Sequence, residues 1–399
     1  MGLFDFLKKK SAEQKTEQKT PDTSKQSESK EELFKEVKKS LEENVTFSVE
    51  VEGPAPLEDL IAVATPSKQG LYPHEILMLE YAPHFKTANN SFQSFWYYQY
   101  SVTEPQAVLD SLYEREFIEV GDLRSALDKL KLTEIKEELK QLNQKVTGKK
   151  NELIDRLMEM ADINSLNEKY SERYYVLTAK GEQELKENQY VSYLHRNKVM
   201  SVWEMNKRIA ETRYPYRDIL WGFFNEQSTF HFSKFNFGLY RNTRLDMYKF
   251  LMEEDKPKTA FHMLCEVLAV DLSGLHNNED SMFEYEKEDP EFYLSLYERR
   301  VERFFPYETA HIIIAPGVLG FFKEIKSILG LDDNKYREAV LEELKKVHLP
   351  RSIFTADEKA DILIASLNED NFALSAIYKG AEQREKARLQ AIKAKIERA

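Results

Sequence analysis

Apolar side chains recur at every third or fourth position over residues 122–167 and over most of the chain beyond residue 190. This spacing is typical of amphipathic helices, because it places the apolar side chains on one face. Short apolar runs at 45–51, 117–120 and 174–177 predict strands. Proline and glycine interrupt the helical pattern at Pro215, Gly238, Pro257, Gly274, Pro290, Pro306, 315–317, Gly330 and Pro350. The pattern predicts a mainly α fold with minor β structure.

Composition changes along the 399 residues predict four regions. Residues 8–30 are almost entirely polar and cannot bury a core, which indicates a disordered tail. The predicted regions are the tail with a short helix at 1–44, an α+β domain at 45–121 that is completed by 165–195, a small helical domain at 122–162 and a larger helical domain at 196–399.

The cysteine count and the charge restrict the compartment and the partners. A single cysteine, Cys265, excludes an internal disulfide framework and favours the cytoplasm. No run approaches the roughly eighteen apolar residues that a membrane span needs, so we expect no membrane insertion. The net charge of -12 opposes general attraction to nucleic acid, so any nucleic-acid binding must come from a local surface.

The segment "LTEIKEELKQLNQKVTGKKNELIDRL", residues 132–157, predicts two helices joined by a tight turn. Its apolar residues fall on one face of each helix, at Leu132, Ile135, Leu139 and Leu142 and then at Leu153, Ile154, Leu157 and Met158. Asn143 tolerates a left-handed backbone and can end the first helix, while Thr147 is a suitable N-cap for the second.

The start of the second helix has the features of a phosphate site. With Thr147 as N-cap, the backbone amides of Gly148, Lys149 and Lys150 are left unpaired in the first turn. Glycine offers no side chain to block approach, and two ammonium groups lie beside it. Free amides and the helix dipole both favour an anion at this end.

This segment resembles the SAP domain, a small helix-turn-helix DNA-binding module. The residues in register with the family pattern are Leu132, Glu134, Ile135, Lys136, Leu139, Lys140, Gly148, Lys150, Leu153, Ile154, Arg156 and Leu157. Two positions depart from it, because Asn143 replaces the turn glycine and Gln144 replaces the leucine that follows. The whole chain, tail included, is also similar to SAP-carrying proteins of unknown role in Gram-positive bacteria and their mobile elements.

The resemblance implies binding to double-stranded DNA through the phosphate backbone and the grooves of A/T-rich duplex. The candidate DNA-binding residues are Lys136, Lys140, Thr147, Gly148, Lys149, Lys150 and Arg156. Residues 131–159 have a net charge of only +1, from seven basic and six acidic residues, so we expect weak, salt-sensitive binding. The alternative interpretation is a surface hairpin with ordinary solvated lysines.

The segments on either side of the hairpin resemble parts of a winged-helix domain. "VLDSLYEREFIEVG" is similar to its leading helix and strand, and "YYVLTAKGEQEL" to its wing strand and closing helix, with Thr178 as a cap. The resemblance implies Arg115, Arg124, Lys180 and Lys186 as contacts. An unrelated small α+β domain is the alternative.

Two later regions also have distinctive composition. Residues 190–250 carry ten basic and five acidic residues interleaved with aromatic ones, and we interpret these aromatics as a helical core rather than as a platform for bases. The acidic run at 277–291 predicts a solvated loop.

No catalytic or metal-binding motif is present in the sequence. His262 and Cys265 are three residues apart, but a structural zinc site needs four ligands, so we interpret both as core residues. We expect no cofactor, no metal and no enzymatic activity.

The hypothesis is a DNA-binding protein whose SAP-like hairpin tethers a helical body to duplex DNA. The alternatives are a protein-interaction or regulatory scaffold and a DNA-processing enzyme with a carboxylate site in residues 196–399.

Overall fold

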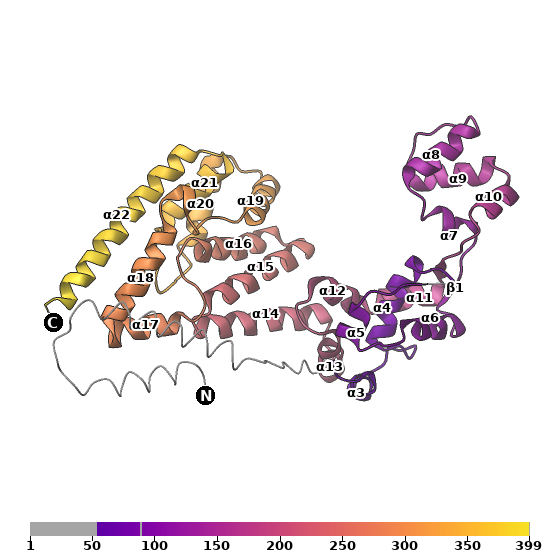
Figure 1. Cartoon of the computed structure of the whole chain (residues 1–399), viewed down its shortest axis with the longest axis horizontal. Helices are drawn as coiled ribbons and strands as arrows, with labels where there is room; N and C mark the ends of the chain where they lie inside the picture. Colours follow the sequence, from indigo (N-terminus) through magenta and orange to yellow (C-terminus); the bar gives the residue numbers. More distant parts are fainter. Residues whose placement is uncertain (1–53, 88–89, 399) are drawn as a thin grey trace, which may run out of the picture. The chain divides into compact units, whose positions relative to one another are not determined.

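The computed structural model describes residues 54–87 and 90–398, which form helices and one two-stranded sheet (Figure 1). The expected fold class, mainly α with minor β, is confirmed. The tail and short helix predicted at 1–44 and the strand predicted at 45–51 lie outside the described residues.

The chain divides into two compact units. The described part of the first comprises residues 54–57 and 92–103 and contains helix α5 (Phe95–Tyr100). Its rings pack against one another, with the Phe95 and Trp96 centroids 5.0 Å apart. The second unit comprises the described residues of 58–91 and 104–399.

The sheet joins two segments that lie far apart in the sequence. Strand β1 (Ile118–Val120) pairs antiparallel with β2 (Tyr175–Leu177), and Glu119 lies opposite Val176. The elements around the sheet are α4 (Pro73–Tyr81), the 3-10 helix η1 (Ala82–His84), α6 (Pro105–Glu114) and α11 (Ala179–Glu187), and α3 (Leu57–Val63) precedes them in the chain. The segment between the strands therefore leaves the sheet and returns to it.

The start of α11 forms as its sequence predicts. The Thr178 hydroxyl accepts a hydrogen bond from the Gly181 amide at 3.3 Å and donates one to the Glu116 carbonyl at 2.8 Å, so the predicted cap is confirmed. A Cβ atom at Gly181 would lie 2.2 Å from the Phe117 carbonyl oxygen. Glycine is therefore required where α11 crosses the end of β1. The winged-helix resemblance of these elements stays a prediction.

Four short helices occupy the segment between β1 and β2. They are α7 (Leu123–Leu127), α8 (Leu132–Gln141), α9 (Lys150–Met160) and α10 (Ile163–Lys169). Their shared core consists of Leu123, Leu127, Ile135, Leu139, Leu153, Ile154, Leu157 and Leu166. None of these helices is long enough to bury this apolar surface alone, so the four stabilise one another.

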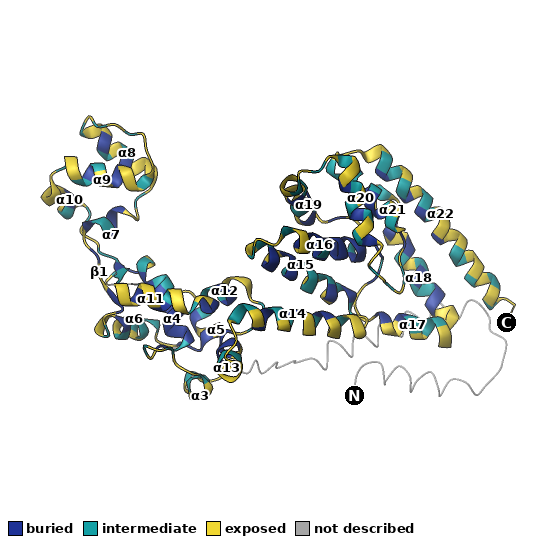
Figure 2. Ribbon diagram, turned by 180° about the vertical axis from the view of Figure 1, so that it is seen from behind, coloured by how far each residue is buried: buried dark blue, intermediate teal, exposed yellow. Residues whose placement is uncertain are grey.

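The remaining helices form a larger helical region. They are α12 (Gln189–Asn197), α13 (Val202–Thr212), α14 (Tyr216–Ser233), α15 (Phe237–Glu253), α16 (Pro257–Asp271), α17 (Glu279–Glu288), α18 (Pro290–Phe304), the 3-10 helix η2 (Tyr307–Thr309), α19 (Pro316–Leu329), α20 (Asp333–Leu344), α21 (Ala356–Leu367) and α22 (Asn371–Ile396). Helix α16 is buried along most of its length (Figure 2). Several starts match the predicted breaks, including Pro257, Pro290 and Pro316.

The interpretation of residues 190–250 as a helical core is confirmed for most of its aromatic side chains. Tyr193, Trp203, Phe237, Tyr240 and Tyr248 are buried. Tyr214, Phe230, Phe232 and Phe235 are exposed, and Tyr216, Trp221 and Phe223 are half-buried.

Two sequence interpretations in the later region are wrong. Residues 279–288 form helix α17 rather than a loop, because Met282 is buried and the buried Glu279 carboxylate accepts a hydrogen bond from Arg300 at 2.7 Å. Cys265 is a core residue, as predicted, but His262 is only half-buried. Its ring nitrogens hydrogen-bond to the Glu266 and Glu343 carboxylates.

Candidate nucleic-acid interface

The α8–α9 hairpin is built on most of its predicted apolar faces, but Leu132, which was predicted to share the inward face, is 41% exposed at the first position of α8. Ile135 and Leu139 from α8 pack with Leu153, Ile154 and Leu157 from α9, and all five side chains are fully buried. The packed core therefore fixes both ends of the turn that joins the helices.

The turn has the predicted left-handed residue. Asn143 has φ of 55°, and the Gln144 amide donates to the Leu139 carbonyl at 2.8 Å, which ends α8 in a regular way. Gln144 occupies the position of the family leucine and is half-buried. Leu142 and Val146 also pack against the core, so the turn retains apolar contacts on both sides of Gln144.

The predicted start of the second helix is wrong by two residues. The N-cap is Lys149, not Thr147, and Lys150 is the first helical residue. Gly148 has φ of 140°, a backbone conformation in which the chain does not continue into the helix, so Thr147 remains in the loop. The free amides of the first turn therefore belong to residues 150–152 rather than to 148–150.

A carboxylate occupies part of the expected anion site. Glu152 accepts a hydrogen bond from the Lys149 backbone amide at 3.0 Å, which is one half of a capping box. Its negative charge lies at the positive end of the helix dipole, where a phosphate would also lie. The corner is exposed at Thr147, Gly148 and Lys149, but Glu152 partly neutralises it.

Arg156 supports the loop that leads into α9, and Lys150 joins the start of α9 to the end of α7. Arg156 donates to the carbonyl oxygens of Lys145 at 2.7 Å and Thr147 at 3.3 Å. The Lys150 ammonium donates to the Asp128 carbonyl at 2.6 Å. Both side chains therefore fix the shape of the corner in addition to adding positive charge.

The other candidate lysines keep their ammonium groups available. Lys140 and Lys149 are exposed and Lys136 is half-buried, and none of the three ammonium groups has a hydrogen-bond or ion-pair partner within 54–87 and 90–398. Lys145 has the same property but was not among the predicted contacts. Lys145 lies outside the family pattern, so the motif does not point to it. In the structure, its carbonyl accepts a hydrogen bond from Arg156, which holds this part of the loop in place.

Lys129 is a further cation close to this corner. Burial lowers the pKa of Lys129, the neighbouring Asp128 carboxylate opposes that shift, and the charge of Lys150 adds to it. Its ammonium lies 5.3 Å from the centre of the Tyr174 ring. Lys129 and Lys150 thus add positive charge beside the start of α9.

The cations implied by the winged-helix resemblance are mostly engaged within the protein. Arg115 pairs with Glu75 at 2.6 Å, Arg124 pairs with Asp155, and Lys180 donates to the Arg115 carbonyl at 2.9 Å. Lys186 is exposed and has no hydrogen-bond or ion-pair partner among the described residues. Between α6 and α11, the freely available lysines therefore lie mainly on the α8–α9 hairpin.

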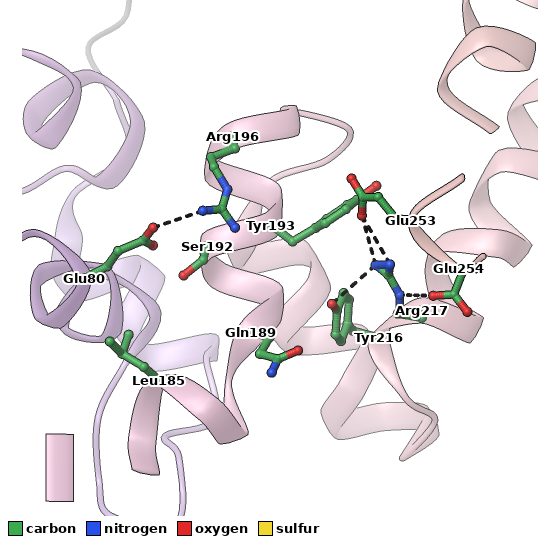
Figure 3. A pocket seen from close by; sticks show the side chains of 10 residues that line it. All are labelled: Glu80, Leu185, Gln189, Ser192, Tyr193, Arg196, Tyr216, Arg217, Glu253 and Glu254. Carbon is green, nitrogen blue, oxygen red and sulfur yellow. Dashed lines mark hydrogen bonds and ion pairs between the residues drawn. The ribbon is translucent and has the colours of Figure 1, made fainter. Parts of the chain in front are cut away.

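A cavity of about 670 Å³ contains three carboxylates, from Glu80, Glu253 and Glu254 (Figure 3). Arg196 lies 3.4 Å from Glu80, while Arg217 lies 3.2 Å from Glu253 and also contacts Glu254. The described residues contain no group of three or more His, Cys, Asp or Glu side chains that could hold a metal ion. The carboxylates of this cavity are therefore engaged in ion pairs rather than grouped around a common point.

Comparisons with known proteins identify one part of the chain. The family model of the SAP domain matches residues 126–159, whereas no curated protein and no solved structure matches the chain. None of the helices described combines the length and the apolar character that a membrane span requires. The chain therefore contains a SAP domain at residues 126–159, and this domain indicates DNA binding in general terms.

Proposed function

We propose that this protein binds duplex DNA without catalysing a reaction on it, and that the SAP domain tethers the helical region to the DNA backbone. The observation that supports the proposal most directly is the match at 126–159 together with the exposed, unpaired ammonium group of Lys149 at the start of α9. The free amides at 150–152 and the neighbouring lysines provide contacts for phosphate oxygens, which position a protein without specifying a sequence.

The proposed contacts differ in role. Lys136, Lys140, Lys145 and Lys149 supply ammonium groups to phosphates, while Lys150 and Arg156 hold the corner in shape through backbone carbonyls. Thr147 and Gly148 form the exposed approach to the helix start. Family members contact A/T-rich grooves, and the same preference is proposed for this chain.

The test is a titration of a labelled A/T-rich duplex with the full chain and with Lys149→Gln. Loss of one phosphate contact should weaken binding several-fold at low salt and reduce the slope of log K against log salt by about 1. Lys149 has no side-chain partner to lose, so its replacement should leave folding unchanged.

The matched control is Lys323→Gln, which removes the same charge from an exposed, unpaired position on α19. This control should bind as the original chain does. Equal affinities and slopes for all three proteins would exclude the proposed contact at Lys149 and favour a hairpin with ordinary solvated lysines.

A further inference from the structure

His262 lies between two carboxylates that come from different helices. Its Nε2 atom is 3.0 Å from a carboxylate oxygen of Glu266, on the same helix α16. Its Nδ1 atom is 2.7 Å from a carboxylate oxygen of Glu343, in the last turn of α20. Both distances are those of hydrogen bonds. The imidazole ring therefore connects α16 to the end of α20.

Only the protonated ring can donate both hydrogen bonds. An ionised carboxylate accepts hydrogen bonds and donates none, whereas a neutral imidazole carries a single N–H group. Loss of the second proton would leave one ring nitrogen with its lone pair facing a carboxylate oxygen, and these two groups repel each other. The geometry around His262 therefore requires the imidazolium form.

Both carboxyl groups are kept ionised by further contacts. Glu266 accepts a hydrogen bond from the Tyr240 hydroxyl at 2.7 Å and lies beside the Arg244 guanidinium group. Glu343 lies 2.7 Å from the Lys346 ammonium group. Burial raises the pKa of each carboxyl group, but these contacts and the imidazole ring outweigh burial, so that both pKa values are lowered. The shared protons therefore reside on the imidazole ring and not on the carboxyl groups.

The protonated ring makes this contact depend on pH. The hydrogen bond to Glu266 raises the pKa of His262 above its ordinary value of 6.5, burial opposes this shift, and Glu343 adds to it. The unfolded chain loses this proton near pH 6.5, while the folded chain keeps it to a higher pH. The stability that the contact contributes is therefore complete below pH 6.5 and is lost as the pH rises through the raised pKa.

Apolar and aromatic packing also joins α16 to α20. The rings of Phe261 and Tyr336 stack with their centroids 5.7 Å apart, and the Val340 side chain is fully buried. Packing of this kind does not change with protonation. It should hold the body of α20 in place at every pH, so the effect of His262 is confined to the end of that helix.

The groups around His262 keep their own charge states near neutral pH. Burial raises the pKa values of Tyr240, Tyr336 and Cys265, and a hydrogen bond to Glu343 raises that of Lys346. The titratable and charged groups of this cluster are Tyr240 and Arg244 on α15, Cys265 and Glu266 on α16, Tyr336 and Glu343 on α20, and Lys346 in the turn after α20.

Lys359 on α21 is a separate pH-dependent contact of α16. Its ammonium group donates to the Ala269 carbonyl at 2.8 Å, seven positions beyond His262, and burial lowers its pKa from 10.5 to about 8. Lys359 bonds to α16 and not to α20, so an experiment that reads the end of α20 can distinguish the two contacts.

We propose that protonated His262 is a clamp that holds the last turn of α20 and the following residues 345–349 against α16, and that the clamp opens when the ring loses a proton. In the open state Glu343 keeps its contact with Lys346, which lies only three positions later and does not reach α16. The proposal goes beyond DNA binding and does not depend on it.

The first measurement is an NMR titration of the full chain, in which the ring C–H signals of His262 report its protonation directly. These signals should titrate above pH 6.5. Glu343→Gln removes one of the two negative charges and should lower the pKa of His262 by about 1. A purely structural role of Glu343 would not move this pKa.

The second measurement is hydrogen exchange of the full chain at about pH 6 and about pH 9, expressed as protection factors so that the intrinsic effect of pH is removed. The amides of residues 341–349 should be about tenfold less protected at the higher pH, as expected for the loss of a hydrogen bond between charged groups. The stacked part of α20 around Tyr336 should keep its protection.

Two variants assign the effect to His262. His262→Gln cannot titrate, so residues 341–349 should have the same protection at both pH values. His311→Gln replaces an exposed histidine and should behave like the original chain. The proposal is overturned if His262 titrates at or below pH 6.5, if residues 341–349 are equally protected at both pH values in the original chain, or if His262→Gln shows the full loss, which would assign it to Lys359.

Discussion

At the scale of single residues, Glu152 determines how well the start of α9 can hold a phosphate. Its carboxylate lies 3.0 Å from the Lys149 amide, at the end of the helix where an anion is most favourable. A DNA phosphate must approach the same end against that negative charge. Glu152 therefore both stabilises the helix start and opposes the binding that we propose there.

Glu152→Gln should strengthen DNA binding. Glutamine can still accept the hydrogen bond from the Lys149 amide, so the cap is kept while the charge is lost. A charge at a helix end contributes about 0.3–1 kcal/mol, which corresponds to a gain of about two- to fivefold in affinity at low salt. Gel-shift titration of the full chain measures this gain.

Glu159→Gln is the matched control, because it removes an exposed carboxylate from the last turn of the same helix. Its effect on affinity should be smaller than that of Glu152→Gln. Equal gains for the two variants would mean that total charge, and not the helix start, controls binding.

His74 makes stability depend on pH. The ring is 5% exposed and stacks on Trp203, and burial lowers its pKa from 6.5 to about 4. The unfolded chain takes up this proton near pH 6.5 while the folded chain resists it. The stability from neutral His74 is therefore complete above pH 6.5 and is lost as the pH falls toward 4, by about 3 kcal/mol at most.

His74→Phe should keep the stacking and remove the titration. Urea unfolding at pH 7 and pH 4.5 should show a smaller loss of stability for this variant than for the original chain. His311→Asn, at an exposed histidine, should behave like the original chain. An unchanged pH dependence in His74→Phe would contradict the low pKa.

At the scale of elements, the helices that the sequence predicted well are those with a clear apolar period. The faces of α8 and α9 were identified from Ile135, Leu139 and Leu153, because side chains three or four apart must share a face. The N-cap was misplaced because Thr147 is the better capping residue by local preference. The positive φ of Gly148 and the reach of Glu152 decide the start instead.

The elements and sites that sequence alone missed depend on distant partners. Arg300 stabilises helix α17 through its hydrogen bond to Glu279, 21 positions earlier in the chain. The acidic composition of residues 277–291 does not reveal this contact. The cavity lined by Glu80, Arg217 and Glu253 forms only after α4, α14 and α15 have packed. No spacing along the chain could therefore have indicated this cavity.

Leu153→Ala tests the packing of the α8–α9 hairpin. The Leu153 side chain is fully buried among Ile135, Leu139 and Leu157, so its loss should lower the free energy of unfolding by about 2–5 kcal/mol. Met160→Ala on the same helix is the control, because that side chain is 48% exposed. Hydrogen exchange of the α9 amides localises the effect, and equal protection in both variants would contradict the described packing.

At the scale of the whole molecule, the charge distribution limits how DNA can bind. The chain carries a net charge of -12, and many arginines of its larger helical region are paired with carboxylates, as in Arg217 with Glu253 and Arg241 with Asp271. These guanidinium groups already pair with carboxylates, so they are not free to bind DNA phosphates and displace the counterions there. Unpaired lysines such as Lys234 and Lys323 also lie on the larger helical region, but the SAP-domain match makes the α8–α9 hairpin the expected source of most phosphate contacts.

The salt dependence of DNA binding should therefore be shallow. Up to four contacts, from Lys136, Lys140, Lys145 and Lys149, give a slope of log K against log salt between about -2 and -4. The measurement is a titration of a duplex with the full chain at several salt concentrations between 50 and 200 mM, a range in which such slopes are resolved. Replacing Lys234 and Lys249 on the larger helical region should not change the slope. A much steeper slope, or one reduced by these two replacements, would show that DNA contacts extend beyond the SAP domain.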